Sequence, residues 1–487
     1  MKIILVQPPL TLEERYGIKS KSGGESIPLG LVYLAAAARA AGHQVDIIDA
    51  EILNLNTAST VEKILAADPA VVGFTAVTIS IDNAAAVARE IKKIKPEIIT
   101  LIGGHHLSTA PEETLKLYPQ FDLGIIGEGE KTLVELLAAL ARGAWDKNQL
   151  REINGLIFKS DDSDEFIITA PRDRIIDLDT LPQPAFDLLP DLIKYSPPVH
   201  TVKKFPASTL VTSRGCPGQC TFCTRSVYGN ILSSHSAEYM MELVLLLYHK
   251  YGIREIQFRD DNFTVFKPRL YKFCELLKKE KLDLVWTALA RVDMVEPEMF
   301  KAMKAAGCWQ VWYGVESGNE NILKLIKKNT TKEQIRNAIN WTKKAGIDVG
   351  AFFIMGHPGE TKETLQETID FALTLKIDEF HCTLMTPLPG SEISGNYSRY
   401  GTFEKNWKKM NEWEPVFVPF GLTKEELIKY NRLFFRKFYF RPRIVLNYMK
   451  RLRSPKHVKI YFLGFLALCE WIISGKKRQE QKIVCQQ

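Results

Sequence analysis

Short apolar runs alternate with helix-like stretches along the first 145 residues. The stretch Leu31–Ala41 has helical composition and ends before Gly42, a residue suited to a helix C-terminus. Near-continuous apolar strands separated by helices are typical of a parallel sheet that is covered on both faces. The pattern predicts a doubly wound, Rossmann-like α/β domain over residues 1–145, with strands at Ile3–Gln7, Val45–Ile48, Val71–Thr75, Ile98–Ile102 and Leu123–Ile126.

Residues 146–205 break this rhythm. Gly155–Lys159 and Glu165–Thr169 flank an acidic segment and predict a β-hairpin. Pro182, Pro184, Pro190, Pro197 and Pro198 follow. Because proline keeps the residue before it out of the helical region, the second half of this segment predicts an extended linker.

From residue 206 to about 400 the alternation of strands and helices resumes. Six βα units predict a partial (β/α)6 barrel of the TIM type, with its chemistry at the carboxyl ends of the strands. The remaining residues, 401–487, predict a helical, basic and aromatic C-terminal region. The six strand candidates of the barrel are Ser208–Thr212, Glu255–Arg259, Val285–Ala290, Gln310–Gly314, Val349–Ile354 and Glu379–Thr383.

The composition of the chain indicates where the protein is located and disfavours nucleic acid as a partner. Hydrophobic residues make up 46% and charged residues 25% of the chain, as in a folded globular protein. The net charge of +7 is concentrated in the last sixty residues, which indicates a local surface and makes nucleic acid an unexpected partner. No cysteine precedes Cys216 and the start lacks a cleavable signal pattern, so we expect a reducing, cytoplasmic location.

Cys216, Cys220 and Cys223 form a CxxxCxxC motif directly after a predicted strand. Thiolates are the ligands of iron–sulfur clusters, and three of them leave one iron of a four-iron cluster open. An open iron can bind the amine and carboxylate of S-adenosylmethionine. Zinc is the alternative, but a structural zinc site takes four ligands, and the next candidates, His235 and His249, lack zinc-finger spacing.

This motif, with Phe222 before its last cysteine, resembles the signature of the radical S-adenosylmethionine superfamily. Later segments resemble its motifs on the fourth strand (residues 314–318), the fifth strand (350–360) and the sixth strand (386–392), so the resemblance covers residues 206–395. It implies that the three cysteines hold a [4Fe–4S] cluster. It also implies contacts to S-adenosylmethionine from Phe222 and Gly356 near the adenine and from Glu316 and Ser317 near the ribose or methionine.

Three charged residues at predicted strand ends have two interpretations each. Arg291 could pair with the carboxylate of the methionine moiety or could bridge Asp293. Asp260 and Asp261 could point into the mouth of the barrel or cap the next helix.

Glycine-rich turns end the predicted strands of the first domain. The turns are GGHH at 103–106 and GEGE at 127–130, and no GxGxxG follows the first strand, which disfavours a dinucleotide. Together with the opening Pro8-Pro9, they resemble the cobalamin-binding domain that precedes many radical S-adenosylmethionine enzymes. The resemblance covers residues 3–140 and implies a cobalamin site at Thr75, Ser80, Gly103, Gly104, His105, Gly127 and Glu128.

One feature of classical cobalamin enzymes is missing from this domain. The DxHxxG motif, whose histidine ligates cobalt, is absent, so the lower ligand of the cobalt stays unassigned. His105 and His106 are candidates for lining the site, or they are surface histidines of a turn.

The C-terminal residues 431–478 combine aromatic, aliphatic and basic side chains. The apolar run Ile460–Ser474 is too short to span a bilayer. The stretch predicts either an interfacial helix at the inner face of an anionic membrane or a helical subdomain packed on the barrel.

The resemblance implies reductive cleavage of S-adenosylmethionine to a 5′-deoxyadenosyl radical, hydrogen abstraction from an unactivated carbon, and methyl transfer from methylcobalamin. The alternatives are an anaerobic magnesium-protoporphyrin monomethyl ester cyclase, an enzyme that modifies tRNA, and a non-catalytic electron-transfer protein. We expect a small-molecule, lipid or tetrapyrrole substrate and an electron donor such as flavodoxin or ferredoxin.

Overall fold

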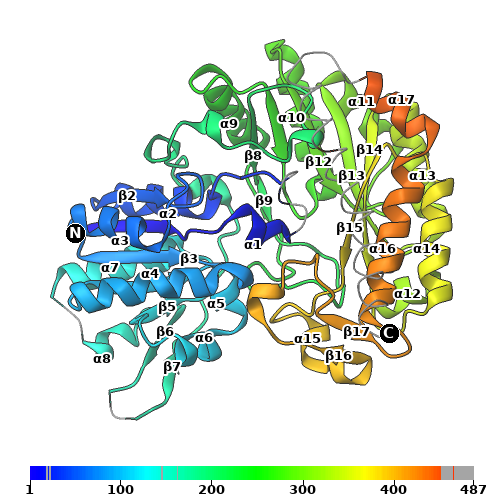
Figure 1. Cartoon of the computed structure of the whole chain (residues 1–487). Coiled ribbons are helices and arrows are strands. Elements are labelled where there is room, and N and C mark those ends of the chain that lie inside the picture. The colour runs from blue at the N-terminus through cyan, green and yellow to red at the C-terminus, as the bar shows by residue number, and fades with distance from the viewer. Residues whose placement is uncertain (18–19, 21–22, 144–145, 162, 451–463, 465–487) are drawn as a thin grey trace.

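Two α/β units lie side by side in the chain (Figure 1). The computed structural model describes residues 1–450 and 464, apart from 18–19, 21–22, 144–145 and 162. Each unit is built on its own sheet, and the two sheets hold seven and six strands in the described residues. This confirms the predicted fold class of a Rossmann-like unit followed by a partial barrel.

The first sheet has the strand order β2-β1-β3-β4-β5-β6-β7. Its first five strands are parallel, whereas β6 and β7 form an antiparallel hairpin that pairs with β5. The hairpin predicted from 155–169 therefore extends this sheet. The strands are β1 (Lys2–Gln7), β2 (Gln44–Asp49), β3 (Val71–Thr75), β4 (Ile99–Gly103), β5 (Leu123–Ile125), β6 (Leu156–Lys159) and β7 (Phe166–Ile168).

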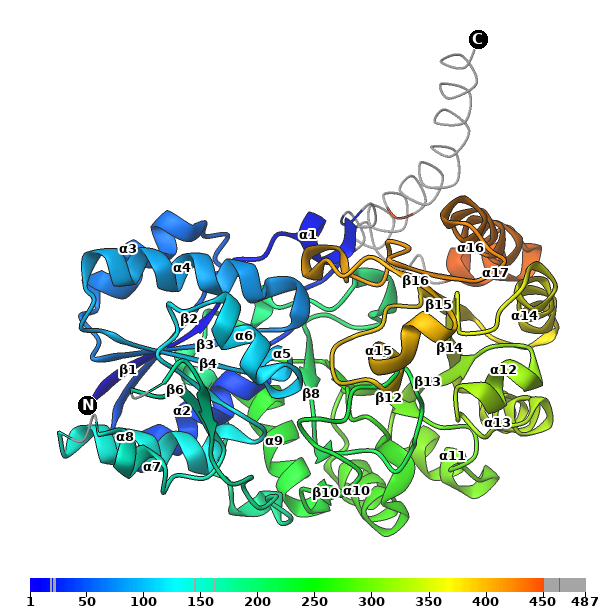
Figure 2. The ribbon, with the colours of Figure 1, turned by 90° about the horizontal axis from the view of Figure 1, so that it is seen from below.

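Helices cover both faces of this sheet, as Figure 2 shows. Ile3 and Leu5 of β1 pack in one apolar cluster, while Ile4 and Val6 pack in another on the opposite face. Both faces of the strand are buried, which explains why its sequence is continuously apolar. The helices of this unit are α1 (Leu12–Tyr16), α2 (Leu29–Ala40), α3 (Thr57–Ala66), α4 (Ile81–Ile94), α5 (His105–Thr109), α6 (Pro111–Leu117), α7 (Gly129–Ala141) and α8 (Lys147–Leu150).

The second sheet is a parallel half-barrel with the order β15-β14-β13-β12-β11-β8. All six predicted strands are present, as β8 (Ala207–Leu210), β11 (Glu255–Phe258), β12 (Val285–Ala290), β13 (Cys308–Glu316), β14 (Asp348–Met355) and β15 (Glu379–Leu384). Two short strands, β9 (Ser213–Arg214) and β10 (Ser233–Ser234), pair beside it. The helices are α9 (Ala237–His249), α10 (Lys267–Glu280), α11 (Pro297–Ala305), α12 (Glu320–Leu325), α13 (Lys332–Lys344), α14 (Lys362–Thr374) and α15 (Glu392–Asn396).

The C-terminal region begins with an antiparallel pair, β16 (Gly401–Phe403) and β17 (Phe417–Pro419), before the predicted helices α16 (Lys424–Tyr439) and α17 (Pro442–Lys450). Phe434 and Phe438 of α16 pack on Phe380 of β15, with ring centroids 4.4 and 4.5 Å apart. The first part of the 431–478 stretch is thus packed on the barrel. The predicted apolar run at 460–474 lies almost entirely outside the described residues.

No helix in the described part of the chain is long and apolar enough to cross a membrane.

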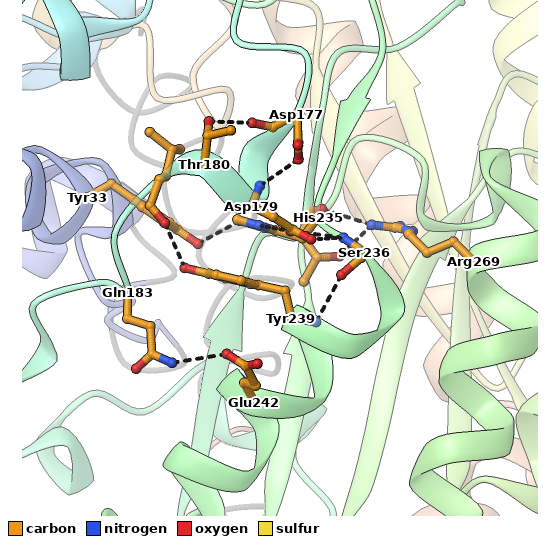
Figure 3. A network of polar contacts seen from close by, with 12 residues as sticks. Tyr33, Asp177, Asp179, Thr180, Gln183, His235, Ser236, Tyr239, Glu242 and Arg269 are labelled. Carbon is orange, nitrogen blue, oxygen red and sulfur yellow. Dashed lines mark hydrogen bonds and ion pairs between the residues drawn. The ribbon is translucent and has the colours of Figure 1, made fainter.

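A buried polar network joins the two units and the segment between them (Figure 3). The hydroxyl of Tyr33, from α2, lies 3.0 Å from Nε2 of His235, whose Nδ1 lies 3.0 Å from a carboxylate oxygen of Asp179. The His235 ring also stacks on Tyr239 at 4.2 Å. Burial lowers the pKa of His235 to about 4, so the imidazole is neutral and can serve as donor and acceptor at once.

Candidate active site

A cavity of about 590 Å³ lies where the carboxyl ends of both parallel sheets meet. Ligands of doubly wound sheets and of barrels bind at this end of the strands. The lining includes most of the residues predicted from sequence: Cys216, Cys220, Cys223, Phe222, Arg291, Glu316, Thr75, Gly103, Gly104, His105, Gly127 and Glu128. The fold thus brings together two sets of residues that are far apart in the sequence.

Three predicted cofactor contacts are not part of this lining. The hydroxyl of Ser80 accepts from the Val77 N–H at 3.1 Å and so shapes its own turn. The hydroxyl of Ser317 lies 3.1 Å from that of Thr368 and accepts from the N–H of Asn319, the residue just before α12, at 3.2 Å. Gly356 has a positive φ of 89° and serves a turn after β14.

The loop that carries the cysteines is held in place by Asp260. Its carboxylate accepts from the Thr212 N–H at 2.6 Å, from the Thr212 hydroxyl at 2.7 Å and from the Ser213 hydroxyl at 2.6 Å. Asp261 lines the cavity and accepts from the Gly215 N–H. Helix α10 instead begins after Phe266, so neither aspartate caps it.

The three thiols differ in burial but share the cavity. Cys220 is buried, Cys216 is half-buried and Cys223 is exposed, and none of them forms a disulfide. The Gly218 N–H donates to Sγ of Cys216 at 3.4 Å, and Nη1 of Arg291 lies 3.8 Å from Sγ of Cys220. Burial raises the pKa of the Cys216 thiol, while this N–H and the Arg291 charge oppose the rise. Donors beside thiolate ligands are the environment that an iron–sulfur cluster uses.

The donor set fits a cluster better than it fits a single ion. Among the described residues, no three His, Cys, Asp or Glu side chains are arranged to hold one metal ion. A zinc ion needs every ligand within about 2.0–2.3 Å of one point, whereas a four-iron cluster offers each thiolate its own iron. His235, the nearest sequence candidate for zinc, already has partners at both ring nitrogens.

Glu316 forms a buried ion pair with Lys328 at the wall of the cavity. Nζ of Lys328 donates to Oε1 of Glu316 at 2.9 Å, and both side chains are at most 8% exposed. Burial alone would lower the pKa of Lys328, but the charge of Glu316 reverses this and the pKa is raised. Gly314 makes room for the pair, because a Cβ there would lie 2.3 Å from Oε1 and 2.6 Å from Nζ.

Of the two interpretations of Arg291 from the sequence, the structure shows the pairing with Asp293. Its Nε and Nη2 each donate to the Asp293 carboxylate at 3.0 Å, and Nη2 also donates to the Lys328 carbonyl at 3.0 Å. This pairing fixes the guanidinium with Nη1 beside Cys220. Phe222 lies on the same wall, with its ring 5.7 Å from that of His357.

Glycines at the tips of the first sheet line the cavity. Gly104 has φ of 93°, and a Cβ there would lie 2.7 Å from the Thr75 hydroxyl and 2.9 Å from the Ala76 carbonyl oxygen, so the packing of this turn requires glycine. At Gly127 an added Cβ would meet nothing within 4 Å. His105 is exposed to the cavity, whereas His106 is buried against Thr78 and Trp407. Of the two histidines, His105 is therefore the one placed to meet a cofactor. The protein walls around the cavity still desolvate the His105 ring and lower its pKa, which favours the neutral imidazole.

Glu128 lines the cavity with its carboxylate already engaged. Arg214 donates to it at 2.6 Å and Arg174 lies 2.9 Å from its other oxygen, while Arg214 also donates to Glu130 at 2.5 Å. Sequence reasoning missed Arg214 and Lys328. Arg214 stands two residues before Cys216 and Lys328 lies twelve residues after Glu316, so proximity to the motifs was the available signal.

Both halves of the chain match known protein families. Residues 17–137 match the family model of the B12 binding domain, and residues 210–372 match that of the radical SAM superfamily. The chain is 36% identical over 450 residues to an uncharacterized methyltransferase of Pyrococcus horikoshii, covering 92% of this chain and 94% of that protein. It is 28% identical over 434 residues to an anaerobic magnesium-protoporphyrin IX monomethyl ester cyclase of Rubrivivax gelatinosus, covering 85% and 76%.

Solved structures share the fold at lower identity. The cobalamin-dependent S-adenosylmethionine radical enzyme OxsB, with aqua-cobalamin and S-adenosylmethionine bound, matches with a TM-score of 0.72 at 19% identity over 97% of this chain and 71% of that chain. The radical S-adenosylmethionine methyltransferase TsrM of Kitasatospora setae, with cobalamin and a [4Fe–4S] cluster bound, matches with a TM-score of 0.65 at 18% identity over 80% and 73%. The chain therefore belongs to the radical S-adenosylmethionine superfamily, in the group with an N-terminal B12-binding domain, and it is an enzyme whose cofactors are a [4Fe–4S] cluster, S-adenosylmethionine and cobalamin.

Proposed function

We propose that this enzyme transfers a methyl group from cobalamin to an unactivated carbon of a small molecule. The observation that carries the proposal is the shared cavity, which is lined at once by the cysteine loop and by the tips of the B12-binding domain. A substrate bound in this cavity would lie between the two cofactors. The relative of Pyrococcus horikoshii, named a methyltransferase, supports the same assignment.

Residues on the walls of the cavity would position the cofactors. Cys216, Cys220 and Cys223 would hold the cluster, with Arg291 facing its sulfur ligands. Glu316, held by Lys328, would accept from S-adenosylmethionine. When bound, the cluster supplies the electron that cleaves S-adenosylmethionine, and cobalamin supplies the methyl group.

On the opposite wall, residues of the B12-binding domain would receive the corrin. Gly103, Gly104 and Gly127 would present backbone to a large planar ring, and Gly127 has nothing within 4 Å of an added Cβ. Thr75 and His105 would contribute the polar contacts. Glu128 would act through Arg214, which fixes this wall against the cysteine loop.

The assignment is tested with holoenzyme reconstituted anaerobically with iron, sulfide and cobalamin. We expect dithionite and methyl-labelled S-adenosylmethionine to give 5′-deoxyadenosine, and a metabolite extract to acquire the labelled methyl group. Cys216→Ala is expected to lose the cluster and both products. Cys274→Ala, which removes a buried thiol outside the cavity, is the matched control. Absence of 5′-deoxyadenosine from the wild-type holoenzyme would contradict the proposal.

The same experiment separates methyl transfer from oxidative cyclisation. Formation of 5′-deoxyadenosine with consumption of magnesium-protoporphyrin monomethyl ester, and no transfer of label, would favour the activity named for the relative in Rubrivivax gelatinosus. The substrate class and the electron donor are also proposals. We propose a tetrapyrrole or lipid substrate and flavodoxin or ferredoxin as the donor that replaces dithionite.

We also propose that α17 contacts the surface of an anionic membrane. Val445, Leu446 and Met449 of this helix are 44, 55 and 59% exposed, and Phe440 just before it is 49% exposed. Three basic residues, at positions 450, 451 and 453, follow this apolar face in the sequence. An exposed apolar helix face beside basic residues is typical of an interfacial helix.

Flotation on vesicles tests this contact in the full-length protein. A cut at residue 430 would divide α16, whose Phe434 and Phe438 are fully buried, so point variants are preferable. Binding to phosphatidylglycerol vesicles and not to phosphatidylcholine vesicles is expected, with loss of binding in Leu446→Glu/Met449→Glu. Ile193→Glu is the control, because Ile193 is 56% exposed elsewhere on the surface. Equal flotation of all three proteins would contradict the contact.

A further inference from the structure

Several cationic side chains line the cavity, and most of them are neutralised within the protein. Arg214 pairs with Glu128 and Glu130, and Arg291 pairs with Asp293. Lys328 pairs with Glu316. Buried charges require such partners, because their removal from water is costly. A cavity-lining cation without a partner is therefore a site where a ligand can supply the missing charge.

Two lining cations have no ion pair with a described residue, Arg225 and Arg259. Arg225 stands two residues after Cys223, where it donates to the Gly218 carbonyl at 3.3 Å and to Oδ1 of Asn230 at 3.0 Å. The other is Arg259. It follows β11 directly, lines the cavity and forms no ion pair with any described residue. Its guanidinium has one hydrogen-bond acceptor among the described side chains, Oε1 of Gln257 at 2.5 Å. Gln257 is itself oriented by donation from its Nε2 to the Thr201 carbonyl at 3.0 Å. The fold thus holds the guanidinium in place while leaving most of its five donors free.

The carboxylates inside the half-barrel are engaged by other donors. Oε2 of Glu255 accepts from the N–H groups of Lys203 and Lys204 at 2.7 and 2.8 Å. Glu379 accepts from Nε2 of Gln310 at 3.1 Å. Burial lowers the pKa of Arg259, while the charges of Tyr16 and Glu255 partly oppose this shift. An anion bound directly to the guanidinium would oppose it further.

An aromatic wall shares the cavity with Arg259. The rings of Trp312 and Phe352 line it with their centroids 4.9 Å apart and their planes inclined by 30°. Outside the cavity lining, the ring of His381 packs on Phe352 and the ring of Trp413 packs on His381, with centroid separations of 5.9 and 4.8 Å. Rings in this arrangement offer a broad apolar surface to a flat ligand.

We infer that Arg259 binds an acidic group of the substrate, a carboxylate or a phosphate, while the wall of Trp312 and Phe352 receives a flat apolar body. Guanidinium groups bind both anions through two parallel hydrogen bonds, so the geometry serves either group. The role of this site in turnover rests on the proposed function. Its ligand preference can be measured without turnover.

Calorimetric titration of the reconstituted holoenzyme with three naphthalene probes tests the inference. The probes are 2-naphthoate, 2-naphthyl phosphate and the uncharged 2-naphthylmethanol. We expect at least one of the two anions to bind about 10- to 100-fold more tightly than the alcohol, as charge-assisted hydrogen bonds imply. The two anionic arms show whether the site prefers a carboxylate or a phosphate.

Variants assign the preference to particular side chains. Arg259→Gln is expected to remove the advantage of the anions and to leave the affinity for the alcohol unchanged, while Arg259→Lys retains part of it. Trp312→Leu is expected to lower the affinity for all three probes to the same extent. Arg254→Gln is the matched control, because Arg254 precedes β11 at its opposite end, outside the cavity lining, where its guanidinium donates to the Tyr248 and Ile253 carbonyl oxygens and lies over the Tyr248 ring. Thermal unfolding confirms that each variant is folded.

Equal binding of charged and uncharged probes by the wild type, no saturable binding of either anion, or an anion preference that survives in Arg259→Gln would overturn the inference. These outcomes are independent of the test of the proposed function. Loss of 5′-deoxyadenosine formation would contradict the chemistry and leave the binding preference standing, whereas loss of the anion preference would leave the chemistry standing.

Discussion

The guanidinium of Arg214 donates to the carboxylate of Glu128 at 2.6 Å across the junction of the two α/β units. Arg214 stands two residues before the first cysteine of the cluster motif, and Glu128 belongs to the glycine turn after β5. The rings of Tyr33 and Tyr228 lie 5.7 and 5.5 Å from the same guanidinium. This single side chain therefore fixes the B12-binding wall of the cavity against the cysteine loop.

Arg214→Gln is expected to destabilise the protein by about 3–5 kcal/mol, because it leaves the buried Glu130 carboxylate without its cation and leaves Glu128 with Arg174 alone. The free energy of unfolding is measured by urea denaturation. Arg39→Gln is the control, because the pair of Arg39 with Asp187 is 44 and 47% exposed and is worth at most about 1 kcal/mol. A similar loss of stability in both variants would show that burial of the Arg214 pair adds nothing.

The sequence was sufficient for the strands and for the cluster motif because both are local signals. The buried strands are continuous apolar runs, such as residues 3–6, and the three cysteines lie within eight residues. The pairing of the 155–169 hairpin with β5 was not predictable, because it depends on contacts between segments.

The residues that sequence reasoning missed owe their roles to distant partners. Arg214 meets Glu128 across 86 positions, and only the fold shows that Arg259 lines the cavity without an ion pair to a described residue. Glu128 was assigned to a cofactor because its turn resembled a family motif, and the structure shows its carboxylate bound to two arginines. Sequence motifs can predict where a site lies. Which of its charged side chains are paired can be known only from the fold.

Gly314→Ala is expected to weaken binding of S-adenosylmethionine by about tenfold or more. The added methyl would lie 2.3 Å from Oε1 of Glu316 and 2.6 Å from Nζ of Lys328, so the buried pair must move. A displaced charged pair loses about 1–3 kcal/mol of hydrogen bonding to its ligand. Equilibrium dialysis with the reconstituted protein measures the affinity. Gly30→Ala is the control, since Gly30 also lines the cavity but has nothing within 4 Å of an added Cβ.

Stability is expected to fall as pH rises from 5 to 8, in part through Glu360. This carboxyl is fully buried, and burial raises its pKa from 4.5 to about 8. Between these two values the folded state binds a proton that the unfolded state has released, so each pH unit costs up to about 1.4 kcal/mol. The contribution of Glu360 is present below pH 4.5 and is lost as the pH approaches 8.

Glu360→Gln removes this titration and keeps an oxygen for the N–H groups of Gly356 and His357, which donate to Glu360 at 2.6 and 3.0 Å. The melting temperature of the variant relative to wild type is expected to rise between pH 5 and pH 8. The exposed Glu333→Gln should show no such trend. If the difference in melting temperature between Glu360→Gln and wild type stays constant over this range, Glu360 does not titrate as described.

Gly350→Ala is expected to disrupt the aromatic wall while leaving the cluster loop intact. The ring of Trp312 lies on the backbone of β14 at Gly350, where an added Cβ would meet three ring atoms at 2.2–2.5 Å. A ring carbon cannot yield at this distance, so Trp312 must leave its position beside Phe352. Overpacking of this kind costs about 1–3 kcal/mol. The expected result is a lower melting temperature and weaker binding of 2-naphthylmethanol, with an unchanged content of iron and sulfide. Retention of full affinity for this probe would mean that Trp312 and Phe352 do not form its binding surface.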